Sequence, residues 1–200
     1  MRKGQLTRQR IIETAAPIFN QRGFSGCSMQ DVMEATGLEK GGLYRHFNSK
    51  EDLALEAFKY AAREAIEARI GDLDQVHGSA EKLLHMVRSF VHVPSPVPGG
   101  CPLMNVAIDA DDGNPALLAS VQEAMKKWKK RLTKIVEKGI RTGEFRAGVE
   151  PRKVANVLIS TLEGALMLSR VEGTRAPMHD AQATLEDLIA GIRTGRGVSN

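Results

Sequence analysis

Residues 28–50, SMQDVMEATGLEKGGLYRHFNSK, decide the fold, because start and stop signals for two short helices follow one another there. Ser28, with Asp31 three residues later, predicts a capped helix start. Gly37 predicts the end of that helix. The turn GLEK then leads into a second short helix over residues 40–47. Two short helices joined by a glycine turn are typical of a helix-turn-helix, in which residues 40–47 would read DNA.

Apolar residues keep a helical spacing on both sides of this stretch. Upstream, they predict a helix over residues 7–22 with Gly23 as its stop, and downstream Ser49 caps a helix that runs to residue 70. Further helices are expected over residues 80–92, 101–110, 114–141, 151–171 and 180–194. Aromatic residues make up only 4% of the chain, and alternating apolar positions are hard to find. The sequence therefore predicts an all-α protein with about nine helices.

The composition is that of a water-soluble globular chain. Of its 200 residues, 42% are hydrophobic and 26% are charged, and no run approaches the roughly 18 uninterrupted apolar residues of a membrane span. We expect a cytoplasmic protein that does not bind a membrane. Cys27 and Cys101 lie in no Cys/His cluster with metal-ligand spacing, so reduced thiols, no metal and no cofactor are expected.

Positive charge is concentrated at the beginning of the chain. Residues 1–50 hold eight Lys and Arg against four Asp and Glu, whereas residues 51–200 hold twenty of each. This asymmetry predicts a domain at residues 1–50 that meets a polyanion and a domain at residues 51–200 with another task. A second group of cations lies on a long helix whose other face is apolar, and it is interpreted as a solubilising surface: Lys126, Lys127, Lys129, Lys130, Arg131 and Lys134.

The stretch TRQRIIETAAPIFNQRGFSGCSMQDVMEATGLEKGGLYRHFNSKEDL resembles the N-terminal DNA-binding domain of the TetR family of bacterial transcriptional repressors, and the likeness covers residues 7–58. The resemblance implies a three-helix DNA-binding domain followed by a larger helical domain that dimerises and binds an inducer. Residues 100–172 are more loosely similar to the regulatory domain of one subgroup, through GCPLMN, NPAL, TGEF and LEGALML.

The resemblance also implies roles for residues around the second short helix. Positions matching Tyr44, His46 and Lys50 contact the DNA backbone in the family, whereas those matching Lys40 and the two glycines after it approach base edges. Arg45 is a further candidate, since Arg and Lys pair well with guanine. The expected DNA-contacting set is Ser28, Lys40, Gly41, Gly42, Tyr44, Arg45, His46 and Lys50.

The remainder of the chain is expected to form a dimer and an effector pocket. The helix over residues 151–171 is apolar nearly all round, so it needs cover from a second subunit, and Leu158→Glu should break the dimer or prevent folding. A homodimer would bind a palindromic operator of double-stranded DNA. Candidates for the lining of a small-molecule effector pocket are Met86, Phe90, Cys101, Met104, Asn105, Met125, Trp128, Glu163 and Met167. Asn105 and Glu163 would either orient the effector or cross-link helices.

Two other functions use Cys101. It follows two glycines and opens a helix, where backbone N–H groups can lower the pKa of a thiol. A repressor that senses electrophiles or oxidants through Cys101 is therefore an alternative to the small-molecule effector, and in the resembling subgroup some members use a cysteine of this motif in that way. A thiol-dependent enzyme is disfavoured, because the sequence contains none of the common catalytic motifs.

Overall fold

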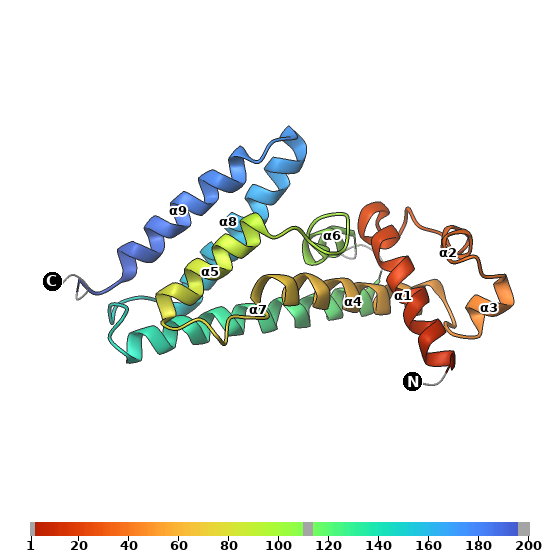
Figure 1. Ribbon diagram of the computed structural model, residues 1–200, viewed down its shortest axis with the longest axis horizontal. Coiled ribbons are helices and arrows are strands. Elements are labelled where there is room, and N and C mark those ends of the chain that lie inside the picture. Colours follow the sequence, from red (N-terminus) through yellow and green to blue (C-terminus); the bar gives the residue numbers. More distant parts are fainter. Residues whose placement is uncertain (1–2, 110–113, 196–200) are drawn as a thin grey trace. The chain divides into compact units, whose positions relative to one another are not determined.

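The computed structural model describes residues 3–109 and 114–195, and the regular structure of these residues consists of helices and one isolated bridge between Phe145 and Arg193. These residues form nine helices, which Figure 1 labels. The all-α prediction is thus confirmed. The helices are α1 (Lys3–Arg22), α2 (Met29–Thr36), α3 (Lys40–Tyr44), α4 (Lys50–Ile70), α5 (Ser79–His92), α6 (Pro102–Asp109), α7 (Pro115–Arg141), α8 (Pro151–Glu172) and α9 (Ala176–Ile192).

Three of the predicted helix boundaries were wrong. Helix α1 begins one turn earlier than expected, so Thr7 lies inside the helix, where its hydroxyl donates to the Lys3 carbonyl at 3.1 Å. Helix α3 ends at Tyr44, and the chain then tightens, with the His46 N–H donating to the Leu43 carbonyl three residues back. Helix α9 begins four residues before its expected start, with Pro177 in its first turn.

The chain forms two compact units. The first unit contains the described residues of Met1–Ile66 and Ser95–Met125, and the second contains those of Glu67–Pro94 and Lys126–Asn200. In the first unit, α1 packs against α2 and α6. Its core gathers apolar side chains from every one of its helices, among them Ile12, Phe19, Val32, Leu43, Phe47, Leu53, Leu103 and Leu117.

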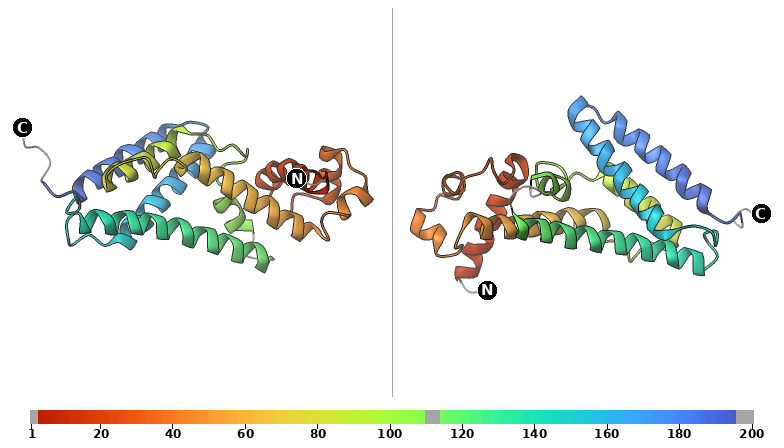
Figure 2. Two further views of the ribbon diagram at one scale, coloured as in Figure 1. Left: turned by 60° about the horizontal axis from the view of Figure 1, so that its bottom comes forward. Right: turned by 180° about the vertical axis from the view of Figure 1, so that it is seen from behind.

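In the second unit, α8 and α9 lie side by side in all three views, and α5 packs on both of them (Figures 1 and 2). The core between these three helices is aliphatic, with Leu83 and Val87 from α5, Leu158 and Leu162 from α8, and Leu185 from α9. By length and composition, α8 also passes as a helix that could cross a membrane, and a third of its apolar window is buried in this unit. Core helices of soluble proteins commonly have that composition.

Candidate nucleic-acid interface

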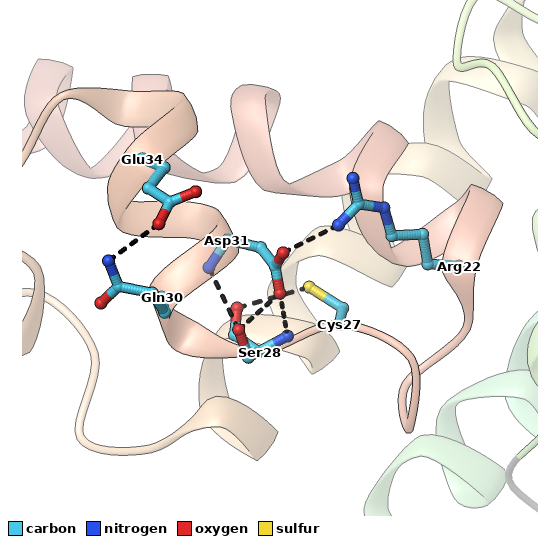
Figure 3. A network of polar contacts seen from close by, with 6 residues as sticks. All are labelled: Arg22, Cys27, Ser28, Gln30, Asp31 and Glu34. Carbon is cyan, nitrogen blue, oxygen red and sulfur yellow. Dashed lines mark hydrogen bonds and ion pairs between the residues drawn. The ribbon is translucent and has the colours of Figure 1, made fainter.

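A reciprocal capping box fixes the start of α2 (Figure 3). The Ser28 hydroxyl accepts a hydrogen bond from the Asp31 N–H at 3.1 Å, and the Asp31 carboxylate accepts from the Ser28 N–H at 2.7 Å and from its hydroxyl at 2.5 Å. These bonds, with Arg22 donating at 2.8 Å, lower the pKa of Asp31, the Ser28 hydroxyl having the largest effect. Beside them, burial raises the pKa of the Cys27 thiol. The helix start is therefore well defined before DNA is bound.

The turn between α2 and α3 is set by Gly37, which adopts a left-handed conformation with φ 68° and ψ 21°. Its N–H and that of Leu38 both donate to the Met33 carbonyl, which closes the end of α2 as predicted. Leu43 and Phe47 are fully buried. Because these two residues hold one side of the α3 segment in the core, its other side faces solvent.

The exposed side of the α3 segment carries the residues expected to contact DNA. Lys40, Gly41, Tyr44 and Arg45 are exposed, and His46 is half-buried. The Lys40 Nζ lies 5.9 Å from the centroid of the Tyr44 ring. A Cβ at Gly41 would meet nothing within 4 Å, so this face is open to a close approach, and Gly42 is partly covered by Leu38. The structure thus brings Lys40, Gly41, Tyr44 and Arg45 onto one solvent-facing surface, which we call the α3 surface.

Two expected DNA contacts lie beside the α3 surface. Lys50 opens α4, and its Nζ lies 4.2 Å from the centroid of the Phe24 ring. A cation held over an aromatic face keeps a defined position, which suits contact with a phosphate. Ser28 is exposed, but its hydroxyl is already used in the capping box, so its structural task is the orientation of α2.

The structure also reveals supporting residues that the sequence analysis missed. Phe24 positions Lys50, and Arg8 lies 4.8 Å above the ring of buried Phe47 while it donates to Glu56 at 3.1 Å. Phe24 follows Gly23, so the QRGF motif offered a signal for it. Arg8 offered none, because its partners lie about forty residues and more away along the chain.

Removing the cap should weaken the helix-turn-helix measurably. Ser28→Ala is expected to lower the free energy of unfolding by about 0.5–2 kcal/mol, as other N-cap deletions do. The lowered pKa of Asp31 stabilises the fold above the ordinary carboxyl pKa, and this stabilisation is lost as the pH falls through the lowered value. Denaturant titrations should therefore give a lower free energy of unfolding for Ser28→Ala than for the wild type at neutral pH. The gap between the two free energies should become smaller in acid. Ser25→Ala, in the same exposed loop, is the control and should show no such pH-dependent difference.

The residues expected to line an effector pocket are divided between the two units. In the second unit, Phe90 and Trp128 stack with ring centroids 6.1 Å apart, and Arg69 lies 4.4 Å above Phe90. Met86 is buried on α5, one turn before Phe90. Arg69 was missed, because its partner Phe90 lies on another helix.

Two further candidates for the effector pocket, Glu163 and Met167, lie on α8 and have different surroundings. Glu163 is half-buried, and Met167 is 49% exposed in the single chain, together with Leu168 and Val171 at 45% and 81%. Helix α8 thus has apolar side chains on two sides. One side packs in the core of the second unit, and the other is exposed near the end of the helix. These three apolar side chains thus form an exposed apolar surface at the end of α8.

In the first unit, Asn105 forms a cross-link. Its Nδ2 donates to the carbonyl and Oδ1 of Asn20, both at 3.0 Å, and to the Gly99 carbonyl at 2.8 Å. Asn20 in turn donates to the Pro98 carbonyl at 2.8 Å. The sequence left two roles open for Asn105, orienting an effector or cross-linking helices. In the structure its hydrogen bonds cross-link α6 and α1.

The remaining candidates of the first unit are Cys101, Met104 and Met125. Cys101 precedes α6 and is only 3% exposed, so its thiol is shielded from reagents in solvent. Met104 and Met125 are half-buried. Among the residues that the structure describes, no group of three His, Cys, Asp or Glu side chains is placed to hold a metal ion.

A capped helix, a left-handed glycine turn and a short helix with an exposed cationic face define a helix-turn-helix DNA-binding protein. Comparison with known families agrees: residues 11–57 match the family model described as bacterial regulatory proteins, tetR family, and residues 79–185 match the one described as tetracyclin repressor-like, C-terminal domain. The chain belongs to the TetR family of bacterial transcriptional regulators. It is therefore a DNA-binding transcriptional regulator, which confirms that part of the sequence interpretation.

Individual relatives support the same assignment. The chain is 26% identical over 175 residues to the HTH-type transcriptional repressor DhaR of Mycobacterium sp. (strain GP1), with 86% of each chain covered. Among solved structures, TetR-family regulators from Cytophaga hutchinsonii and Chloroflexus aurantiacus are 38% and 40% identical, each with a TM-score of 0.92. Both cover 98% of this chain, and 99% and 100% of their own.

Proposed function

We propose that the chain is a cytoplasmic homodimeric repressor that binds a palindromic operator and leaves it when a small-molecule effector binds. The observation that carries the proposal is the α3 surface, which combines Lys40, Tyr44 and Arg45 on a segment fixed by the capping box and by buried Leu43 and Phe47. In this proposal residues 1–50 form the DNA-binding domain, and residues 51–200 bind the effector and dimerise. The protein is not an enzyme.

The expected residue roles are those that the resemblance to the TetR family implies, and the chemistry of these side chains agrees with them. Lys40 reads a base edge, while Gly41 and Gly42 allow close approach, and Arg45 is a second reader. Tyr44, His46 and Lys50 hold the DNA backbone. Ser28 acts through the orientation of α2. Two copies of this arrangement would place their readers in successive major grooves, with half-sites about one helical turn (~34 Å) or a larger phased spacing apart.

The cross-link of Asn105 supports regulation by an effector, because it joins a helix of the regulatory sequence to helix α1 of the DNA-binding sequence. A ligand that displaces α6 would pull on α1. Within the second unit, Phe90, Trp128 and Arg69 would form the aromatic and cationic part of an effector-binding site. Burial of Cys101 favours this route over direct sensing by its thiol.

Titration of the protein with an effector, in the absence and presence of operator, tests release. Effector candidates are found first by the rise in melting temperature that they cause. If the effector releases the repressor, linkage requires that operator lowers effector affinity by the same factor as effector lowers operator affinity. Equal effector affinities in the two titrations would contradict release, and tighter binding with operator present would indicate a corepressor.

Lys40 and Lys50 should have different effects on DNA binding. Lys40→Ala should relax specificity at one base pair of each half-site by roughly 1–3 kcal/mol, because a base contact is lost. Lys50→Ala should weaken binding to all sequences alike and reduce the dependence of affinity on salt, because a phosphate contact is lost. Tyr44→Phe should weaken binding without a change in salt dependence.

The measurement is binding to a set of single-base variants of the operator at several salt concentrations. Lys153→Ala removes an exposed cation from α8 and is the control, with affinity and specificity unchanged. An unaltered base preference for Lys40→Ala would remove Lys40 from the readers. A sequence-selective loss for Lys50→Ala would contradict its contact with the backbone.

A further inference from the structure

A second cluster of cations surrounds a cavity in the second unit. The cavity has a volume of about 210 Å³ and lies between the connection from α4 to α5, the start of α5, and α7. Four cationic side chains line it, Lys82, Arg131, Lys134 and Lys138, against the single carboxylate of Asp74. The pattern of charges in the sequence predicted that Arg131 and Lys134 are part of a solubilising surface. The structure instead places them at the wall of a concave site.

The arrangement on α7 concentrates like charges. Arg131, Lys134 and Lys138 are three and four residues apart, so they share one face of the helix, where like charges repel. Lys82 adds a fourth positive charge from α5. A concave wall with low-dielectric sides focuses this potential and attracts an anion.

The nearby carboxylate of Glu144 does not neutralise the four cations of the cavity, because it is bonded to the start of α5. Its two oxygens accept hydrogen bonds from the Ser79 and Ala80 N–H groups, at 2.6 and 2.7 Å, at the positive end of α5. Glu144 is thus engaged with the start of α5. Asp74 remains as the carboxylate in the lining itself, and it is exposed.

Arg131 is positioned before any ligand arrives. Its guanidinium donates to the Ile70 carbonyl at 3.1 Å, and the residue is half-buried. A guanidinium has five N–H donors in a planar fork that matches carboxylate and phosphate groups. An arginine held by one of these donors therefore presents the others in a defined direction at little cost in side-chain entropy.

We propose that this cavity binds a small organic anion that carries two or more carboxylate or phosphate groups. Its volume is below the roughly 300–1,000 Å³ of sites for drug-sized ligands, so a small metabolite suits it better than a large one. Leu73 and Ile135 supply apolar wall for a short carbon skeleton. None of the nine residues expected to bind the effector lines this cavity, so it is a separate site. Its recessed shape favours a small anion over the rigid backbone of duplex DNA.

Calorimetry and fluorescence of the full chain test this proposal. Trp128 is the single tryptophan of the sequence and lies three residues before Arg131 on α7, so it can report occupancy. The probes are citrate for the carboxylate source and pyrophosphate for the phosphate source, with acetate at equal ionic strength as a singly charged reference. We expect saturable binding of one probe molecule per chain for citrate or pyrophosphate, and none for acetate. The tighter of the two identifies the preferred anionic group.

Charge removal at the site should weaken this binding selectively. Lys134→Gln with Lys138→Gln should reduce the affinity about tenfold or more, since two charge-assisted contacts are lost. The matched control is Lys126→Gln with Lys153→Gln, which removes the same charge from exposed positions outside the lining. Gln has nearly the helix propensity of Lys, so both variants should fold.

Three results would overturn the proposal. The first is the absence of saturable binding of either probe at millimolar concentration. The second is an equal loss of affinity in both variants, which would indicate general ionic attraction. The third is displacement of the bound probe by duplex DNA without an operator, which would assign the cations to DNA. None of these results depends on whether an effector releases the operator.

Discussion

Replacing Leu168 and Val171 together by glutamate should convert the protein to monomers and reduce operator affinity by about 10³-fold or more. Both side chains lie at the exposed apolar end of α8, at 45% and 81% exposure in the single chain. Covering them with a second subunit removes apolar surface from water, and two buried unpaired carboxylates would oppose that burial. A monomer engages only one half-site, so its affinity should fall toward that of non-specific binding.

Sedimentation gives the oligomeric state, and titration with operator DNA gives the affinity. Gln75→Glu with Gln122→Glu adds the same charge at exposed positions outside α8 and should remain dimeric. Leu158→Glu is a poorer test than the sequence suggested, because Leu158 is fully buried within one chain and a charge there should unfold it. A well-folded wild-type monomer at micromolar concentration would contradict the dimer.

Gly99→Ala should destabilise the first unit by about 2–4 kcal/mol. Gly99 has φ 112°, a conformation that other residues rarely adopt. A Cβ there would lie 2.7 Å from the carbonyl oxygen of Asn20 and 2.8 Å from its Nδ2. The added methyl group would therefore strain the loop and push apart the contact between this loop and the end of α1.

Denaturant unfolding of Gly99→Ala, with operator affinity measured in parallel, tests this expectation. Asn105→Ala should have a related but smaller effect of about 1–3 kcal/mol, because it leaves buried acceptors of Asn20 without their donor. Gly148→Ala is the control, since a Cβ there meets nothing within 4 Å. If Gly99→Ala proved as harmless as Gly148→Ala, the loop would not hold α1.

Those features of the fold that depend on neighbours in the sequence could be predicted. The capping box of Ser28, the stop at Gly37, the cap at Ser49 and the inward direction of Leu43 and Phe47 all arise within a few residues. Such signals act through local hydrogen bonds and helical periodicity. The helix-turn-helix and the candidate DNA-contacting surface can therefore be predicted from residues 28–50 alone.

Features that depend on distant partners could not be predicted. Asn20 and Asn105 are 85 residues apart, and the sequence left the role of Asn105 undecided until the hydrogen bonds were known. The stacking of Arg69 on Phe90 was hidden for the same reason. The sequence also could not tell which apolar side chains of α8 belong to the core and which stay exposed, since periodicity gives faces but not their partners.

Selection of bound sites from random duplex DNA is the most direct test of the proposal that two copies of the α3 surface read an operator. The wild-type chain should enrich a two-fold symmetric sequence, with half-site centres about one helical turn (~34 Å) apart or at a larger phased spacing. Lys40→Ala should broaden the preference at one position in each half-site and leave the spacing unchanged. Enrichment of a single asymmetric element, or of no sequence at all, would contradict the proposal.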